Sequence, residues 1–341
     1  MAIDTSVAND IANAVLDFFV RSPAMAQTTQ DKPLLAFLKS GQKTFPAGKT
    51  NVCEPVKGTY MNTVAGFFQG YSEDTQLVFT QAQNILQTSY AWKEVHAGLI
   101  ITWTELKKDG ITVRDHNETT DHGTELTRLV GLMEDRLLDY AESWARAKNQ
   151  MFWADGTQDT NQVPGIQAIL PDTYGTVGGL AQGTYAFWKH LIVTAIAVEP
   201  NTSNLIETIR ANVIQLRRYG GRPNKALCGS AFLAGLRQEI QAKGLFTQQG
   251  FTKTQDIGMG SITIPEIGSF DYDPSLDDLS LSKRCYVMDG RRLRLRPMEG
   301  EDDKTLKPER PYDYMVFLKS MTWTGALVSN QENCHAILEI A

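Results

Sequence analysis

The chain has 341 residues, a length that suggests about two folding units of ordinary size. Apolar residues make up 42% and charged residues 21%, which is the balance of a globular protein rather than of a disordered or fibrous one. The formal net charge of −6 argues against a free protein that coats nucleic acid through bulk positive charge.

The cysteines, the amino terminus and the apolar runs predict the cellular compartment of the protein. The four cysteines contain no CxxC pair, so they predict idle or buried thiols rather than a zinc site or a disulfide framework. They are Cys53, Cys228, Cys285 and Cys334. The first basic residue is Arg21, so the amino terminus lacks the charged segment of a secretory signal. The longest strongly apolar run, 191–198, is shorter than the roughly 18 residues that span a bilayer. We therefore expect a soluble protein made in the cytoplasm.

Residues 1–45 have the pattern of an arm without a core of its own. Apolar residues recur at helical spacing over 7–18, and a polar linker follows at 22–33. A short second helix is predicted at 34–38 and stops at Gly41. We expect this arm to lie on something else.

Residues 44–92 are rich in Thr, Gln, Tyr, Phe and Gly, which is typical of a long β-ribbon. Alternation at 50–56 supports extended strands, and no Lys or Arg occurs over 58–92. The segment 91–106 is rich in β-branched and aromatic residues, which predicts a buried strand that runs into a short helix.

Residues 124–153 carry the strongest structural signal, a continuous apolar stripe at spacings of four and three. The stripe comprises Leu126, Val130, Met133, Leu137, Tyr140, Trp144, Ala147 and Met151. Gly156 ends the pattern. At 1.5 Å per residue the helix would be roughly 45 Å long. A helix of this length usually serves as a spine against which other elements or other chains pack.

The second half of the chain mixes helices and strands. Residues 154–188 are predicted as a glycine-rich surface segment, and 203–219 as an amphipathic helix with Ser203 as its N-cap and Ile214 among its buried residues. A short buried strand and a helix are expected within 225–243. Further strands are expected at 261–264, 284–288, 293–296, 315–324 and 336–340. This order indicates an α+β fold.

Motifs for catalysis are weak throughout. Residues 48–50 (GKT) resemble the end of a phosphate-binding loop, but Lys43 stands where that loop needs glycine. The densest potential metal ligands have no standard zinc spacing and are expected to form a solvated loop: Asp115, His116, Glu118, Asp121 and His122. The remaining histidines are expected to be packed or surface side chains: His96, His190 and His335. The sequence thus predicts no enzyme, no catalytic, cofactor-binding or metal-binding residues, and no cofactor.

Five short segments are each weak as motifs, but their shared order and spacing is more specific. They are SYAWKEVHAGLIITWTEL at 89–106, NQMFWADGT at 149–157, PGIQAIL at 164–170, GTVGG at 175–179 and WTGALVSN at 323–330. Their order and spacing resemble the major capsid proteins of tailed bacteriophages, which share the Hong Kong 97-type fold. The resemblance covers roughly residues 35–341.

The resemblance implies an α+β, Hong Kong 97-like major capsid fold in five parts. These would be an N-terminal arm at 1–45, an extended loop at 46–92, a peripheral domain at 93–199 with its spine helix at about 124–153, an axial domain at 200–310, and C-terminal strands at 311–341 that return to the peripheral domain.

The resemblance also implies a structural protein that self-assembles as pentamers and hexamers into an icosahedral shell around the double-stranded DNA of a tailed bacteriophage. Implied partners are other copies, a separate scaffolding protein, a portal, a decoration protein and packaged DNA through non-specific contact, without a membrane. The implied location is the virion, after assembly in the host cytoplasm. An encapsulin-type nanocompartment shell that encloses a cargo enzyme is the alternative. In the type member a lysine of the extended loop cross-links the shell, so the lysine-free stretch 58–92 predicts a shell held by non-covalent contacts.

Arginines alternate with leucines near residue 293. Strand alternation would place Arg292, Arg294 and Arg296 on one face. One interpretation is a solvated face balanced by the nearby acids of 299–303. The other is an ion-pair surface against a neighbouring subunit, or an inward face near packaged DNA. The sequence leaves both open.

Overall fold

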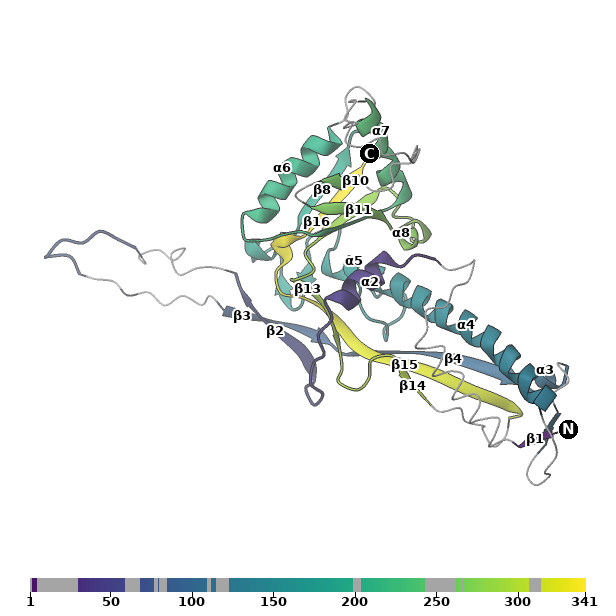
Figure 1. The fold of residues 1–341 in the computed structure, drawn as a ribbon. Coiled ribbons are helices and arrows are strands. Elements are labelled where there is room, and N and C mark those ends of the chain that lie inside the picture. Colours follow the sequence, from purple (N-terminus) through teal and green to yellow (C-terminus); the bar gives the residue numbers. More distant parts are fainter. Residues whose placement is uncertain are drawn as a thin grey trace.

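The computed structural model is an elongated molecule with a projecting hairpin (Figure 1). It describes residues 2–4, 30–58, 68–76, 79, 85–108, 112–114, 123–198, 204–242, 262–264, 267–306 and 314–341. The helix expected at 7–18 and the potential metal ligands at 115–122 lie outside these ranges. In the described part of the chain, no helix combines the length and apolar character needed to cross a membrane.

The lower unit in Figure 1 is built on one long helix and a sheet of long strands. Helix α4 spans Gly123–Trp153, which confirms the predicted spine. Strand β15 (Val316–Ser329) pairs antiparallel with β4 (Lys93–Thr102) and also with β13 (Leu293–Pro297) and β14 (Lys304–Thr305). Helix α3 (Trp103–Lys108) continues directly from β4.

Helix α2 (Pro33–Ser40) confirms the short helix expected near the amino terminus. Its apolar face is buried against α4 and the sheet, with Leu34 at 0% and Leu38 at 1% exposure. Lys32 precedes the helix and pairs with Glu142 of α4 at 2.6 Å. The described end of the predicted arm therefore packs on the body of its own chain.

Over residues 136–153 of α4, whose side chains are described, the predicted stripe is correct except at one position. Tyr140, Trp144 and Met151 are buried, whereas Ala147 is exposed and Lys148 is buried in its place. The reason is tertiary, because the Lys148 ammonium lies over the rings of Trp144 and Trp323 and pairs with a carboxylate beyond them. Side chains of residues 123–135 lie outside the description.

One burial prediction in this unit is wrong, and another holds only in part. Strand β4 is only half-buried, because one face packs on α4 while the other, including Ile100 at 60% exposure, is open. The segment 154–188 is mostly exposed or half-buried, as predicted for a surface segment, but several of its apolar side chains are buried. Its short elements are α5 (Ile166–Ile169), β6 (Thr176–Val177), β7 (Leu180–Ala181) and the 3-10 helix η2 (Ala186–Trp188).

The apolar residues of 154–188 come in pieces too short to show a period, yet they fill space at the end of α4 and under the hairpin. The buried ones are Val163, Ile166, Ile169, Leu170, Val177, Leu180 and Trp188. Gly165 permits the close approach, because a Cβ there would lie 2.2 Å from the Phe152 carbonyl oxygen.

The upper unit is a six-stranded sheet in the order β10-β11-β9-β12-β16-β8. Its strands are Ile262–Ile264, Gly268–Tyr272, Lys225–Cys228, Arg284–Met288, Ala336–Ile340 and Leu191–Ile196 in that order. Helices α6 (Leu205–Arg217) and α7 (Ser230–Ala242) bury their apolar faces against it. Short helices follow at α8 (Pro274–Asp278) and η3 (Glu332–Cys334).

The strands and helices expected in this unit are confirmed, with two corrections at α6. Asn204 occupies the N-cap position, while Ser203 lies outside the described residues. Ile214 is 65% exposed because it lies on the outer side of the helix, away from buried Ile209 and Val213. The mixed architecture confirms the α+β class.

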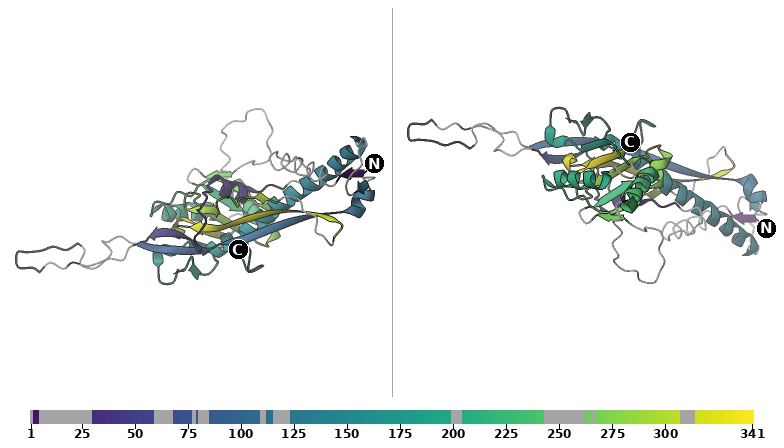
Figure 2. Two further views of the ribbon diagram at one scale, coloured as in Figure 1. Left: turned by 90° about the horizontal axis from the view of Figure 1, so that it is seen from below. Right: turned by 90° about the horizontal axis from the view of Figure 1, so that it is seen from above.

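The hairpin pairs β2 (Asn51–Lys57) with β3 (Ile85–Ala91) in antiparallel register, as the alternation predicted. Figure 2 shows the hairpin and the start of α4 at opposite ends of the molecule. A separate parallel pair joins β1 (Ala2–Asp4) to β5 (Thr112–Arg114) near that far end.

Candidate functional site: interaction surfaces

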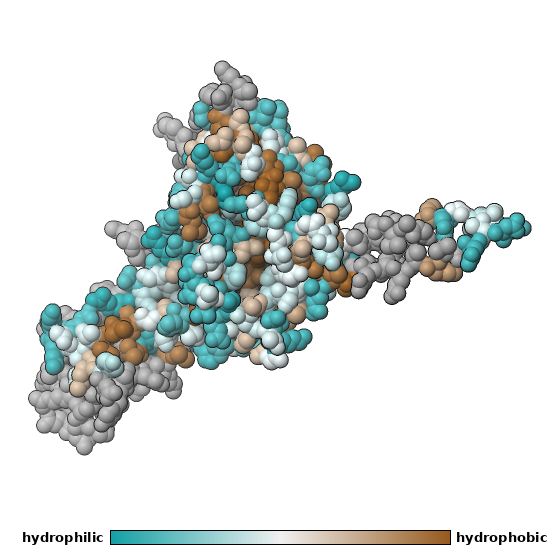
Figure 3. Space-filling view, turned by 180° about the vertical axis from the view of Figure 1, so that it is seen from behind, coloured by the Kyte–Doolittle hydropathy of each residue, from teal (hydrophilic) through white to brown (hydrophobic). Residues whose placement is uncertain are grey.

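The far end of the hairpin presents aromatic side chains to solvent. Phe68 is 94% exposed, Tyr71 74% and Phe79 91%. The adjacent charged residues, Glu73 and Asp74, are both acidic and exposed. Figure 3 shows apolar residues on this projecting segment, far from the main body. Exposed aromatics of this size mark a surface for contact with another protein.

The root of the hairpin is firmly attached. The Trp92 indole donates a hydrogen bond to the Lys49 carbonyl at 2.8 Å and packs edge-on against Phe45. The Tyr90 hydroxyl donates to the Ser329 carbonyl at 3.1 Å, and burial raises the pKa of this phenol. These contacts hold the hairpin at a defined angle to the body.

The arginines in and beside β13 differ in their ion-pair partners. The predicted alternation is confirmed, since Leu293 and Leu295 are buried while Arg294 and Arg296 are half-buried. However, the predicted balance by the acids of 299–303 is wrong. Arg296 pairs instead with Glu54 of β2, which is brought against it by the hairpin.

One of the acids that follow β13, Asp303, binds the spine rather than the arginines. Asp303, which has a positive φ of 49°, accepts hydrogen bonds from the Trp144 indole at 3.0 Å and from the Lys148 ammonium at 2.7 Å. Lys39 of α2 reaches its second oxygen at 3.2 Å. Burial disfavours the Asp303 charge, but the two lysines outweigh burial and lower its pKa. Burial also lowers the pKa of Lys148.

A second buried carboxylate joins the two units. Asp273, at 0% exposure, accepts a hydrogen bond from the Trp153 indole at 2.8 Å and one from the Asn149 amide at 3.2 Å. It also caps α8 by accepting from the Ser275 backbone at 3.0 Å. The carboxyl end of the spine is therefore tied to the six-stranded unit.

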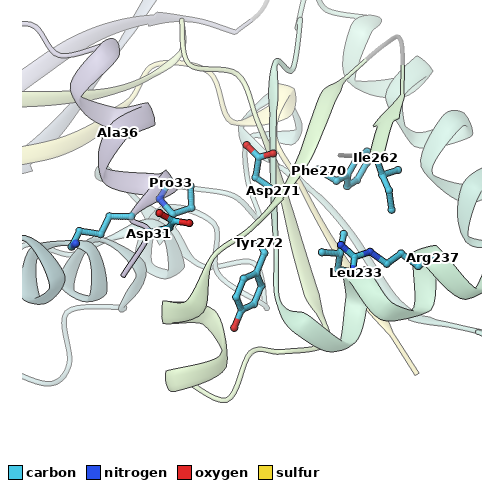
Figure 4. Close-up of a pocket in the computed structure, with 10 residues that line it drawn as sticks. Asp31, Pro33, Ala36, Leu233, Arg237, Ile262, Phe270, Asp271 and Tyr272 are labelled. Atoms are coloured by element: carbon cyan, nitrogen blue, oxygen red, sulfur yellow. The ribbon is translucent and has the colours of Figure 1, made fainter. Parts of the chain in front are cut away.

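Cavities are the places where an enzyme site would be expected. One of about 480 Å³ lies between α2 and the six-stranded unit, with Asp31, Arg237, Asp271 and Tyr272 on its wall (Figure 4). Asp271 is engaged by Lys225, and the Tyr272 hydroxyl donates to Asp277 at 2.7 Å, which raises the pKa of Tyr272 to about 12. No nucleophile and base lie together on this wall.

The potential metal ligands at 115–122 lie outside the described residues, whereas the other three histidines lie within them. Among the residues the structure places, no three His, Cys, Asp or Glu side chains converge to hold a metal ion. His190 and His335 are packed side chains, and burial lowers the pKa of each to about 4. His96 is exposed on β4.

The cysteines are closer together than the sequence suggested. Cys228 and Cys285 face each other on β9 and β12 with their sulfurs 3.3 Å apart, both fully buried. Both are free thiols, as are the other two cysteines. Sequence spacing alone could not reveal a pair made by neighbouring strands.

The arrangement of parts defines the fold. A long spine helix crosses a sheet of long strands, a projecting hairpin leaves one end, and a six-stranded α+β unit stands on the other side. This is the Hong Kong 97-type capsid fold, as solved structures of similar proteins show.

Three of these structures illustrate the likeness. The cyanophage A-1(L) capsid subunit aligns with a TM-score of 0.62 and 12% identity, over 93% of this chain and 94% of that one. The capsid of a native GTA particle aligns at 0.57 with 15% identity, over 95% and 96%. The capsid of Myoviridae phage XM1 aligns at 0.54 with 12% identity, over 94% and 95%. No family model and no curated protein matches the sequence.

Proposed function

We propose that this chain is the major head protein of a tailed bacteriophage, a structural subunit that self-assembles into an icosahedral shell around double-stranded DNA. The observation that carries the proposal is the alignment over more than nine-tenths of both chains with capsid subunits. The proposal assigns no catalytic activity to the chain. Its place is the virion, after assembly in the host cytoplasm.

The division into parts follows from the same proposal. Residues 1–45 are the arm, 46–92 the extended loop, 93–199 with 311–341 the peripheral domain, and 200–310 the axial domain. The exposed aromatics of the hairpin support assembly, because a free subunit gains nothing from holding Phe68 and Phe79 in water. Burial of these rings against a neighbour would release roughly 25 cal/mol per Å² of apolar area.

The proposed partners are further copies as pentamers and hexamers, with packaged DNA held by non-specific contact. A separate scaffolding protein, a portal and a decoration protein complete the proposed particle. The shell is proposed to be held without covalent cross-links, because 58–92 contains no lysine.

The test is expression of the chain followed by sedimentation and negative-stain microscopy. We expect the expressed chain to form closed particles or rings. We also expect virions built from this chain to contain DNA. Boiling the particles in detergent should yield a single band near the 37.9 kDa monomer. Particles filled with a protein cargo would favour a nanocompartment, and a chain that never forms large assemblies would refute the shell.

A further inference from the structure

A buried carboxyl group lies in the connection between the two units. Figure 1 follows the chain from β15 in the lower unit to β16 in the upper unit, and η3 lies between these strands. Glu332 begins η3 and is 0% exposed. Among the residues that the structure describes, neither of its carboxyl oxygens has a hydrogen-bond partner, and the same holds for the buried Ser329 hydroxyl. A buried charge without partners is costly, so this carboxyl group is held in its neutral form.

The root of the hairpin rests on the same connection. The Tyr90 hydroxyl of β3 donates to the Ser329 carbonyl at 3.1 Å, and the Ser329 backbone N–H donates back to that hydroxyl at 3.4 Å. Burial and, after it, the Glu332 charge raise the pKa of the Tyr90 phenol, so Glu332 lies within electrostatic reach of the hairpin. The neighbouring Ser89 N–H donates to the Gly178 carbonyl at 2.9 Å. A charge on Glu332 would therefore act on the contacts that hold the hairpin.

The charged and titratable groups around Glu332 come from the hairpin, the turn between β12 and β13, η3 itself, and the two elements that pack on η3. They are Tyr90, Glu54, Asp289, Arg291, Arg292, Cys334, His335, Lys189, His190, Arg217 and Arg218. Asp289 and Arg291 pair with each other at 2.6 Å, and Glu54 is engaged by Arg296. Burial therefore dominates at Glu332 and raises its pKa to about 8.

We propose that Glu332 is a proton-controlled latch at the root of the hairpin. While its carboxyl group is protonated, η3 stays packed and Tyr90 stays bonded to Ser329. When the group loses its proton to water, the carboxylate has to be solvated, because the closed connection offers it no partner. Solvation opens the connection and releases Tyr90 from Ser329. The proton on Glu332 thus controls how firmly the hairpin is held at its angle to the body.

Opening of the latch should become easier as the pH rises. In the closed state the pKa of Glu332 is about 8, whereas its ordinary value, regained in water, is 4.5. The opened state therefore binds fewer protons between these values, and its population should grow by about tenfold per pH unit until the pH nears 8.

The range from pH 6.5 to 8 isolates Glu332 from its neighbours. His190 and His335 have an ordinary pKa of 6.5 and a pKa of about 4 in the folded chain, so both are largely neutral above pH 6.5 in either state. Burial raises the pKa of Cys334 to about 12, from an ordinary value of 9. The pKa of Asp289 is lowered and that of Arg291 is raised, so both stay charged.

The experiment is amide hydrogen exchange on the unassembled full chain between pH 6.5 and 8. Protection factors are compared, because they correct for the intrinsic pH dependence of exchange and report the population of the opened state. The amides of Ser89 and Ser329 report on the latch. The Gly229 amide, which donates to the Arg284 carbonyl at 3.0 Å, is the reference in the six-stranded unit. In the wild type, protection of the two reporters should fall by about tenfold per pH unit, while that of Gly229 stays constant.

Two variants identify the group that titrates. Glu332→Gln keeps the size of the side chain and removes its proton, so protection of Ser89 and Ser329 should no longer depend on pH. Glu94→Gln, the same change on the exposed face of β4, should keep the wild-type slope. Circular dichroism checks that each variant is folded. If Glu332→Gln does not fold, the wild-type series still decides whether the latch exists.

Three results would overturn the inference. The first is constant protection of both reporters in the wild type over this pH range. The second is an equal fall at Gly229, because Glu332 would then act on the stability of the whole subunit rather than on the hairpin. The third is a wild-type slope in Glu332→Gln, which would assign the titration to another group. Shell formation is measured separately by sedimentation, so the proposed function stands or falls independently of these results.

Discussion

The six-stranded unit and the β2–β3 hairpin place their apolar side chains in opposite environments. The unit buries its own, with Ile209, Phe232 and Leu236 at 0% exposure between helices and sheet. The hairpin buries Val52 and Val56 only at its root, and its far end carries exposed aromatics.

Under the proposed assembly, the six-stranded unit is stabilised within one chain and the hairpin end by a neighbouring copy. A two-stranded hairpin alone is marginally stable in water, because it has too few neighbours to bury its surface. The six-stranded unit completes its core from residues of one chain. Mutations in the unit should therefore act on the folding of the subunit, and mutations at the hairpin end on contacts between subunits.

The largest expected effect comes from opening a cavity in the six-stranded unit. Phe232→Ala should lower the free energy of unfolding by about 3–5 kcal/mol, through lost burial and the cavity left behind. Denaturant titration of the unassembled subunit measures this. Phe79→Ala, the matched change at an exposed ring, should leave the same quantity nearly unaltered. Equal losses in both variants would contradict the contrast.

The next effect concerns the buried ion pair that joins the spine to the acids after β13. Asp303→Asn leaves the Lys148 ammonium, 3% exposed, without its countercharge. This should cost about 3 kcal/mol of unfolding free energy. Adding Lys148→Met should recover much of that loss, because the uncompensated charge is then gone. If the double variant unfolds as easily as Asp303→Asn, the ion-pair explanation is wrong.

Acid should weaken the body through its packed histidines. His190 and His335 have pKa values lowered by burial to about 4, below the ordinary value of 6.5. Between pH 6.5 and 4 the unfolded chain therefore binds protons that the folded chain does not, and stability falls as the pH falls.

The loss should reach about 2–3 kcal/mol per histidine near pH 4. Melting temperatures recorded over this range should fall less steeply for His190→Gln than for the wild type. His96→Gln, on the exposed face of β4, is the control. Identical pH profiles for the wild type and His190→Gln would rule out this source of acid sensitivity.

Substitutions at the exposed end of the hairpin should have the smallest effect on the free energy of unfolding but a large effect on assembly. Phe68→Ser with Phe79→Ser should change the free energy of unfolding by less than about 0.5 kcal/mol, because both rings already lie in water. Particle yield in sedimentation should nevertheless drop sharply. A normal yield of closed particles would show that the hairpin end makes no important contact.

The sequence by itself determined the elements and their order. The spine α4 could be predicted because its apolar period is local and continues over many turns. Strands β9, β12 and β16 could be predicted for the same reason, since short apolar runs bounded by turn residues carry their own signal. The ordered motifs from 89 to 330 also indicated the capsid fold.

Only the tertiary structure decided which side of each element is covered. Lys148 is buried instead of Ala147 because Asp303, 155 residues away, supplies its partner. Arg296 pairs with Glu54, 242 residues away, and nothing in the sequence around either residue predicts the other as its partner. Periodicity reports which faces of an element differ, whereas burial and ion pairing depend on what the fold brings against those faces. A single sequence contains no local record of those distant partners.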